Sequence, residues 1–264
     1  MSRRRLDTLL AERGLFESRS RAAAAVLAGE VRLGSGGARA AKPGQMVGDD
    51  EVVEVDERPA FVSRGGVKLA NALDELGLDP AGRRCLDLGA ATGGFTDCLL
   101  QRGARSVVAV DVAYGELHWR LRHDPRVTVV ERTNARELDG ADLPFATDLV
   151  VADVSFISLT KVLGPALRAA APRFDCLALV KPQFEVGRGR VGKGGVVRDP
   201  DERRGALIAV GRFAREELGL SVLAYASSGL PGPAGNEESF VWIAEAGRDG
   251  GVEDLEQAAR RAEP

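Results

Sequence analysis

Residues 84–95 read RCLDLGAATGGF, and this stretch decides the fold. An apolar strand candidate runs directly into a loop of small residues, and a helix candidate begins at Phe95. Small residues at the tip of a first strand let a ligand approach the backbone closely in open α/β sheets. The glycine spacing is G-x-x-x-G-G rather than the G-x-G-x-x-G of dinucleotide enzymes, which disfavours a nicotinamide-dependent oxidoreductase.

Strand and helix candidates alternate around this loop. The strand candidates are residues 84–88, 106–111, 127–131, 148–152, 176–180, 221–226 and 240–244. The helix candidates are residues 67–76, 95–102, 115–122, 159–170 and 200–218. The alternation predicts an α/β fold with a Rossmann-like, seven-stranded, mostly parallel sheet that is covered on both faces. The last two strands lie close together in the sequence, so we expect them to form an antiparallel, hairpin-like end.

The first part of the chain follows another pattern. It reads as two short helices and then short strands, which is typical of a small α+β unit. We expect this domain at residues 1–58, a linker at 59–66, the larger domain at 67–247, and a mobile acidic tail at 248–264.

Charge is distributed unevenly along the chain. The net charge is −3, but residues 1–48 carry nine Lys or Arg and four acids, a balance of +5 that leaves −8 for the remainder. A small basic unit joined to a larger acidic one favours a nucleic-acid partner, although a solvated helical face would look the same.

Composition also bears on compartment and metal binding. Cys85, Cys98 and Cys176 are widely spaced, which argues against a disulfide framework or a zinc site. The first residues lack a long apolar stretch behind their positive charges, and the Ala-rich run 21–29 is too short to span a bilayer. We therefore expect a cytoplasmic monomer without a metal and without membrane contact.

The loop and its surroundings fit S-adenosylmethionine, which has no pyrophosphate but needs an acid for its ribose. Asp111 ends the second strand 22 residues after Gly89, where a carboxylate can accept both ribose hydroxyls. Asp87 is placed to pair with the ammonium of the methionine part, and Asn134 to bind adenine. Asp111 as a turn residue and Asn134 as a plain loop residue are the alternatives. The predicted cofactor residues are Asp87, Gly89, Ala90, Thr92, Gly93, Gly94, Phe95, Asp111, Val112, Asn134 and Asp153.

Asp153 and Lys181 follow long apolar runs, at the strand ends where such sheets carry their reactions. The chain has no Asn-Pro-Pro-Tyr motif and no cysteine in a strand-end loop, which disfavours an exocyclic amine or a pyrimidine ring carbon as methyl acceptor. A hydroxyl acceptor remains, and a lysine can take its proton only as a neutral amine. Desolvation or a second cation such as Lys68 favours that form. Glu238 is a candidate to orient Lys181 or the substrate, while a capping role remains open for both strand-end charges.

These four residues resemble a known tetrad. Lys68, Asp153, Lys181 and Glu238 match, in order and context, the Lys-Asp-Lys-Glu set of FtsJ-like RNA 2′-O-methyltransferases. The segments SRGGVKL, DLGAATGGFTD, ERTNARE, DVSFISL, KPQFEVGRGRVGKGGVVRDP and GPAGNEESF look like the TlyA family, also called hemolysin-type. The resemblance covers residues 3–244.

The resemblance implies a class I methyltransferase that uses S-adenosylmethionine for 2′-O-methylation of cytidine in ribosomal RNA. It also implies that Lys181 accepts the proton while Asp153 and Lys68 assist. Glu237 adjoins the site glutamate, and we favour Glu238 because it stands two residues after Asn236, as in the family.

The first 58 residues are similar to the alpha-L RNA-binding motif of a small-subunit ribosomal protein and of pseudouridine synthases. The sequence departs from this motif at Leu33–Gly37, where an Asn-Gly turn is more usual. The matching residues are Arg5–Asp7, Gly14-Leu15, Ser18-Arg19, Ala22 to Gly29, Val31 and Lys42–Gly44. The similarity implies that basic side chains meet phosphates. The residue candidates in this domain are Arg4, Arg19 and Arg21.

A second basic stretch, Gly187–Arg198, contains five glycines beside Lys181. We interpret it as an RNA clamp that orders on binding, with a solvated surface loop as the alternative. The RNA candidates outside the first domain are Arg64, Arg188, Arg190 and Lys193.

Two other classes of protein compete with a ribosomal RNA methyltransferase. One is a non-catalytic factor that binds ribosomal RNA or ribosomal subunits during assembly, which the intact lysines and the Gly89 loop disfavour. The other is a membrane-active hemolysin, which would need apolar or amphipathic stretches that the sequence lacks.

Overall fold

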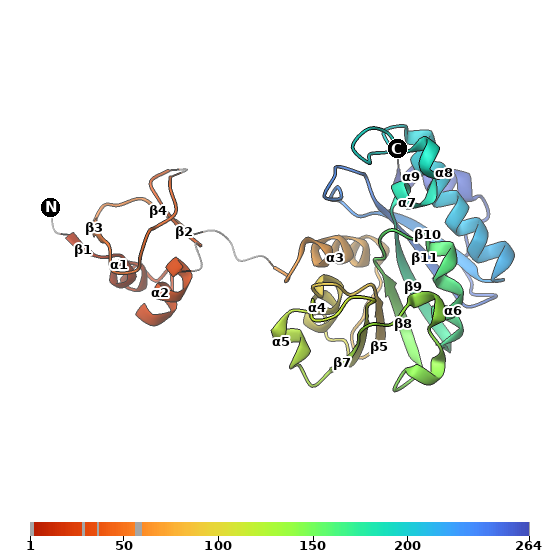
Figure 1. Cartoon of the computed structure of the whole chain (residues 1–264), viewed down its shortest axis with the longest axis horizontal. Coiled ribbons are helices and arrows are strands. Elements are labelled where there is room, and N and C mark those ends of the chain that lie inside the picture. Colours follow the sequence, from red (N-terminus) through yellow and green to blue (C-terminus); the bar gives the residue numbers. More distant parts are fainter. Residues whose placement is uncertain (1–2, 28–29, 36, 56–59, 264) are drawn as a thin grey trace. The chain divides into compact units, whose positions relative to one another are not determined.

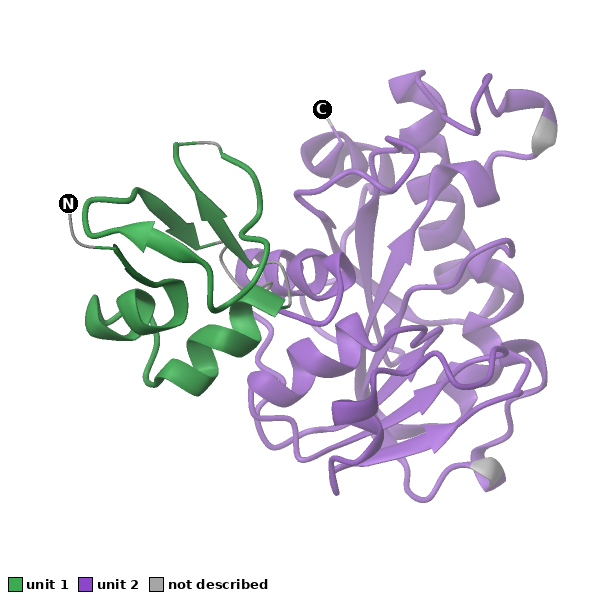
Figure 2. Cartoon of the chain, turned by 60° about the vertical axis from the view of Figure 1, so that its left-hand side comes forward, with its two compact units in different colours: residues 1–59 green, residues 60–264 purple. Residues whose placement is uncertain are grey.

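The computed structural model describes residues 3–27, 30–35, 37–55 and 60–263 (Figure 1). The chain forms two compact units, Met1–Pro59 and Ala60–Pro264, which are coloured separately in Figure 2. The sequence predicts that the second helix ends at about Ala28, and this residue and the first residue of the expected linker lie outside the described residues.

The first unit has a core of its own. Its elements are β1 (Arg3–Arg5), α1 (Leu6–Glu12), α2 (Arg19–Leu27), β2 (Val31–Leu33), β3 (Met46–Gly48) and β4 (Val53–Val55). Strands β1 and β3 pair antiparallel, as do β2 and β4. Apolar residues at helical spacing on α1 and α2, among them Leu6, Leu10 and Val26, pack with Val31 and Val47. The small α+β unit expected from the sequence is therefore present.

The second unit is built on one seven-stranded sheet of order β10-β11-β9-β8-β5-β6-β7. Its strands are β5 (Arg84–Leu88), β6 (Ser106–Val110), β7 (Val127–Val130), β8 (Thr147–Ala152), β9 (Ala170–Val180), β10 (Ser221–Ser227) and β11 (Ser239–Ala244). Strands β7, β6, β5, β8 and β9 pair in parallel, whereas β11 lies antiparallel between β9 and β10. The mostly parallel seven-stranded sheet and its antiparallel end are confirmed.

Helices cover both faces of this sheet. They are α3 (Arg64–Leu76), α4 (Gly94–Gln101), α5 (Trp119–Arg122), α6 (Leu163–Arg168), α7 (Pro182–Glu185), α8 (Pro200–Arg212) and α9 (Leu255–Ala262). Side chains alternate along a strand, so Leu86 and Leu88 belong to the core cluster that includes α6, α8 and α9, whereas Cys85 belongs to the cluster that includes α3 and α4. No helix in the described ranges is long and apolar enough to cross a membrane.

The end of the chain differs from the expectation of a mobile tail. Asp254 caps α9 by accepting hydrogen bonds from Glu256 N at 2.9 Å and Gln257 N at 3.1 Å. Leu255 and Ala259, which face α8, are buried in the core of the second unit. The prediction of a mobile tail was wrong. The segment is acidic overall, but its apolar residues recur at helical spacing and form one face of a helix.

Helix α3 also begins earlier than expected, at Arg64 instead of residue 67. Gly66 belongs to this first turn, and a Cβ there would lie only 2.4 Å from the side chain of Phe61. The glycines that suggested a linker are therefore needed for close packing of the helix start.

Candidate active site

The loop after β5 lies in close contact with the carboxyl ends of β6 and β8. Gly89 has φ +86°, and a Cβ there would lie 2.7 Å from the carbonyl oxygen of Asp153. Its amide and that of Ala90 both donate to Val110 O, at 2.9 and 3.1 Å. A glycine is required at this position because the backbone is left-handed and in contact with the loop after β8. The arrangement leaves an open surface above the loop.

Gly93 and Gly94 serve packing at the start of α4. A Cβ on Gly93, which has φ +95°, would lie 2.3 Å from Leu121 Cδ1, and one on Gly94 would lie 2.1 Å from Ser63 Oγ. The missing side chain at Gly93 therefore lets α5 pack against the loop, and the missing side chain at Gly94 lets the start of α3 pack there. Gly93 was expected among the cofactor residues, but it lines neither of the two cavities described next.

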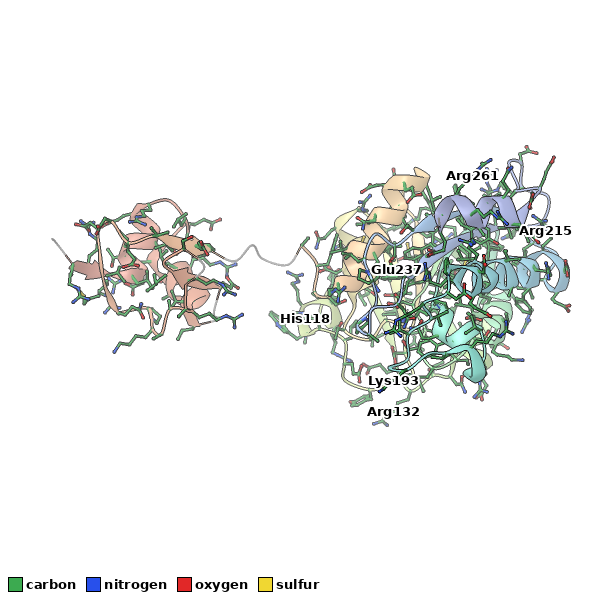
Figure 3. All side chains as sticks on the ribbon, turned by 90° about the horizontal axis from the view of Figure 1, so that it is seen from above. His118, Arg132, Lys193, Arg215, Glu237 and Arg261 are labelled. Atoms are coloured by element: carbon green, nitrogen blue, oxygen red, sulfur yellow. The ribbon has the colours of Figure 1, made fainter. Side chains whose placement is uncertain are left out.

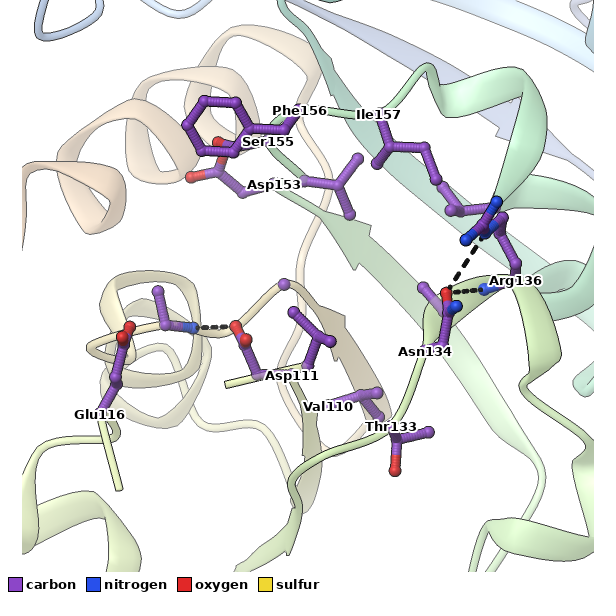
Figure 4. A pocket seen from close by; sticks show the side chains of 16 residues that line it. Val110, Asp111, Glu116, Thr133, Asn134, Arg136, Asp153, Ser155, Phe156 and Ile157 are labelled. Atoms are coloured by element: carbon purple, nitrogen blue, oxygen red, sulfur yellow. Dashed lines mark hydrogen bonds between the residues drawn. The ribbon is translucent and has the colours of Figure 1, made fainter. Parts of the chain in front are cut away.

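Among the described residues, two cavities beside the loop have room for a ligand. The larger, of about 470 Å³, opens between the ends of β6, β7 and β8 (Figure 4). The smaller, of about 140 Å³, reaches from the loop to Lys181. The expected residues that line the larger one are Gly89, Asp111, Val112, Asn134 and Asp153. Those that line the smaller one include Gly89, Ala90, Thr92, Gly94, Phe95 and Asp153. Because residues such as Gly89 and Asp153 line both cavities, the two cavities are parts of one depression.

Asp111 is held in one orientation at the floor of the larger cavity. Its two oxygens accept hydrogen bonds from Ala91 N and Ala113 N, each at 2.8 Å, and Figure 4 shows the first. Asn134 lines the same cavity and also caps a short 3₁₀ helix, where its side chain accepts from Arg136 N at 3.1 Å. Asn134 thus caps this short helix and still lines the cavity.

Asp87 lies beneath the loop and is fully buried. Oδ2 accepts from the amide of Thr96 at 2.9 Å and from its hydroxyl at 2.6 Å, while Oδ1 has no hydrogen-bond partner among the described atoms. Burial raises the pKa of this carboxyl to about 7, and the charges of Asp153 and Asp111 act in the same direction. A buried oxygen without a partner is uncommon and calls for an explanation, and Asp87 itself lines neither cavity.

The tetrad forms two ion pairs. Lys181 Nζ lies 2.6 Å from Asp153 Oδ1 and donates to Ser155 Oγ at 2.9 Å. Lys68 Nζ donates to Glu238 Oε2 at 2.5 Å, and both side chains are almost completely buried. Ser239 pairs with Val180 in the sheet, which brings Glu238 to the end of β9 that precedes Lys181.

Glu238 thus orients Lys68, whereas our expectation gave it Lys181 or the substrate. Its neighbour Glu237 is exposed, so the buried partner of Lys68 is Glu238. The second oxygen, Oε1, is another buried atom for which the described residues provide no hydrogen-bond partner.

The basic residues expected to meet RNA have different surroundings. Arg4 pairs with Glu12 and Asp49, and Arg19 lies 3.4 Å from Asp7. Arg21 and Lys193 are exposed, and Lys193 is labelled in Figure 3.

The remaining basic candidates belong to the second unit. Arg64 donates to Pro231 O at 2.7 Å, and Arg190 to Glu202 at 3.0 Å. The side chain of Arg188 lies outside the described part. The basic stretch already contains ordered turns, with Gly192 N bonded to Val196 O at 3.1 Å.

Sequence reasoning missed the loop that follows Asp153. Phe156 lines the larger cavity, has φ +65° and is 92% exposed, with its ring 5.3 Å from that of Phe184. Glu185 ties this loop to α7, because it accepts from Ser158 Oγ at 2.6 Å and Leu159 N at 2.8 Å. The position of the loop directly after a buried strand was the signal available in the sequence.

The sheet order, the glycine loop and the lysine–aspartate pair at the strand ends define a class I methyltransferase. The FtsJ-like methyltransferase family matches residues 61–245, and the S4 domain family matches residues 4–53. The chain belongs to the TlyA family, as its sequence motifs indicated.

Relatives agree along nearly the whole chain. A Mycobacterium tuberculosis protein named 16S/23S rRNA (cytidine-2′-O)-methyltransferase TlyA is 51% identical, over 99% of this chain and 98% of the relative. Hemolysin A of Brachyspira hyodysenteriae is 40% identical, over 74% of this chain and 81% of the relative. The solved structure of a Streptococcus thermophilus protein described as a hemolysin has a TM-score of 0.73 and 36% identity, covering 99% of this chain and 96% of that one.

Proposed function

We propose that this protein transfers a methyl group from S-adenosylmethionine to the 2′-hydroxyl of cytidine in ribosomal RNA. The observation that carries the proposal is Lys181, which lines the smaller cavity and is paired with Asp153, a residue that lines both cavities. The name of the 51% identical relative supports the same acceptor. Because ribosomal RNA is the substrate, the protein acts in the cytoplasm.

The cavities fit the cofactor in two parts. The larger cavity has the volume for an adenosine, with the fixed carboxylate of Asp111 at the ribose and Asn134 near the base. The partnerless oxygen of Asp87 suits the ammonium of the methionine part. The bound cofactor supplies an electrophilic methyl group on its sulfonium.

The chain's residues then prepare the acceptor hydroxyl. Lys181 Nζ can take the hydroxyl proton only once it is the neutral amine and no longer the ammonium partner of Asp153. The ribose oxygen then forms its new bond to the methyl carbon while the sulfur–carbon bond breaks, and the proton stays on Nζ. Asp153 and Ser155 fix the position of Nζ, which makes the proton transfer geometrically possible. Lys68 and Glu238 form the second ion pair, which is buried near the end of β9.

The RNA contact is assigned to two basic regions. The S4 unit presents Arg21 and other basic side chains, and the second unit presents Lys193 near the catalytic lysine in sequence. Phosphate contacts of this kind position the substrate without reading its bases.

The test is methyl transfer from labelled cofactor to separated ribosomal subunits, followed by mapping of modified riboses. We expect Lys181→Ala to abolish transfer while cofactor affinity changes less than about twofold, since Lys181 acts on the acceptor. Lys161→Ala, an exposed lysine outside both cavities, is the matched control.

Retention of most turnover by Lys181→Ala would remove its role as proton acceptor. Tight subunit binding by the unaltered protein without any ribose methylation would instead favour the non-catalytic assembly factor.

A further inference from the structure

Asn236 is a buried polar residue in the connection between β10 and β11, only 1% exposed. Its Oδ1 accepts from Val197 N at 2.9 Å, and its Nδ2 donates to Gly195 O at 2.8 Å. The side chain thereby satisfies both a donor and an acceptor of a backbone segment about 40 residues away in sequence. Only an amide offers this combination of groups with this shape.

The segment that Asn236 holds is the base of the basic loop, Gly187–Arg198. Val197 is buried in the core of the second unit, which fixes one end of the loop. A turn closed by Gly192 N and Val196 O precedes it, and Lys193 at that turn is exposed. Arg190 pairs with Glu202 of α8. The loop thus has a fixed base and a tip that presents positive charge.

On its other side, Asn236 is joined to the reaction site. Two residues further on, Glu238 binds Lys68. The connection Ser228–Glu238 is also held by α3, through the bond from Arg64 to Pro231 O and a bond of 3.0 Å from Asn71 Nδ2 to Ser228 O. Asn236 O accepts from Gly232 N at 2.7 Å, which closes the turn before Glu238.

We propose that Asn236 is a positioning residue that fixes the basic loop relative to the Lys68–Glu238 pair, so that phosphates bound by the loop place the acceptor ribose at Lys181. The inference rests on the proposed function, and it adds a residue outside the Lys-Asp-Lys-Glu tetrad. The side-chain bonds of Asn236 go to the basic loop, so we expect its effect on RNA and not on the cofactor.

The first measurement compares Asn236→Ala and Asn236→Asp with the unaltered protein. Loss of two buried hydrogen bonds is expected to raise the KM for RNA about tenfold, with the cofactor Kd unchanged within about twofold. Asn236→Asp keeps the acceptor for Val197 N but turns an oxygen toward Gly195 O, so it should behave like Asn236→Ala. Asn71→Ala, which loosens the same connection without touching the loop, should have the smaller effect on KM.

A double-mutant cycle decides whether Asn236 acts through the loop. If it does, Asn236→Ala has little further effect in a background carrying Arg190→Ala and Lys193→Ala, because the charges it positions are gone. Increases in the KM for RNA that are additive in the cycle would overturn the inference. A KM for RNA that stays unchanged in both Asn236 variants would also overturn it. A parallel loss of cofactor affinity would reduce Asn236 to a structural role.

Folding and substrate are checked separately. Cofactor binding and thermal unfolding report whether each variant folds, and if Asn236→Ala does not, the cycle is run with Asn236→Asp. Hydrogen exchange should quicken at Gly195 and Val197 but not at the Gly89 loop; equal exchange everywhere contradicts the inference. Unaltered protein that methylates no RNA refutes the proposed function, whereas active protein with an additive cycle refutes only the role of Asn236.

Discussion

At the scale of single residues, the site depends on buried charges that the protein satisfies only in part. Asp87 Oδ1 and Glu238 Oε1 both lack a hydrogen-bond partner within the described structure. Leaving such groups unsatisfied costs stability, and the cost is recovered if a ligand supplies the missing donor. If Asp87 binds the cofactor as we propose, the missing donor is the ammonium of the cofactor, and binding then depends on the ionisation of Asp87.

Cofactor affinity is therefore expected to fall at acidic pH. The pKa of Asp87 is raised to about 7 by burial, so above that value the carboxylate is ionised and pairs with the ammonium. Below it the carboxyl is protonated, and affinity should fall by up to about tenfold per pH unit, since each binding event then releases one proton. Calorimetric titration from pH 5 to 8.5 measures this.

Asp87→Asn is the control for this titration. It removes the charge, so it should bind the cofactor weakly and with little pH dependence in the same window. A variant that keeps the slope of the unaltered protein would show that a group other than Asp87 causes it.

At the scale of elements, the sequence predicted what is local. The strands were found because strands buried on both faces are apolar throughout, and Asp153 and Lys181 because charges stand out directly after such runs. Glu185 and Asn236 could not be assigned, because each acts through contacts between loops 26 or more residues apart in sequence. Helix α9 was missed because its apolar stripe, which includes Leu255, is short.

The close packing of α5 against Gly93, in the loop after β5, gives a prediction at this scale. Gly93→Ala places a methyl group against Leu121 in a left-handed backbone, which should lower the free energy of unfolding by about 2–4 kcal/mol. Gly115 is also left-handed, with φ +78°, but no atom lies within 4 Å of its Cβ position. Gly115→Ala should therefore cost only the backbone strain, about 1–2 kcal/mol.

Urea unfolding of both variants separates the two contributions. Equal losses of stability in Gly93→Ala and Gly115→Ala would mean that α5 can shift to make room for the methyl group and is not closely packed against Gly93. The larger loss in Gly93→Ala should be accompanied by weaker cofactor binding, because the loop that carries Gly89 and Ala90 must shift.

At the scale of the whole molecule, the two units divide the work. Each has its own apolar core, and the basic balance of residues 1–48 belongs to the S4 unit while the cavities and the tetrad belong to the other. Removing residues 1–59 should accordingly weaken binding to ribosomal RNA far more than binding of the cofactor. Equal RNA affinity with and without them, measured by filter binding, would contradict this division.

Salt dependence tests the same division without truncation. If basic side chains of the S4 unit contact phosphates, the logarithm of the RNA association constant falls linearly with the logarithm of the salt concentration. The slope is about −0.9 per phosphate contacted on a duplex and about −0.7 on a single strand. Arg21→Ala removes an exposed cation of α2 and should reduce the slope by about 1, whatever the base sequence of the RNA. Arg212→Ala, an exposed arginine of α8 in the other unit, should leave the slope unchanged. A slope that responds to Arg212 and not to Arg21 would assign the phosphate contacts to the methyltransferase unit, because the slope counts only the cations that displace ions from the RNA.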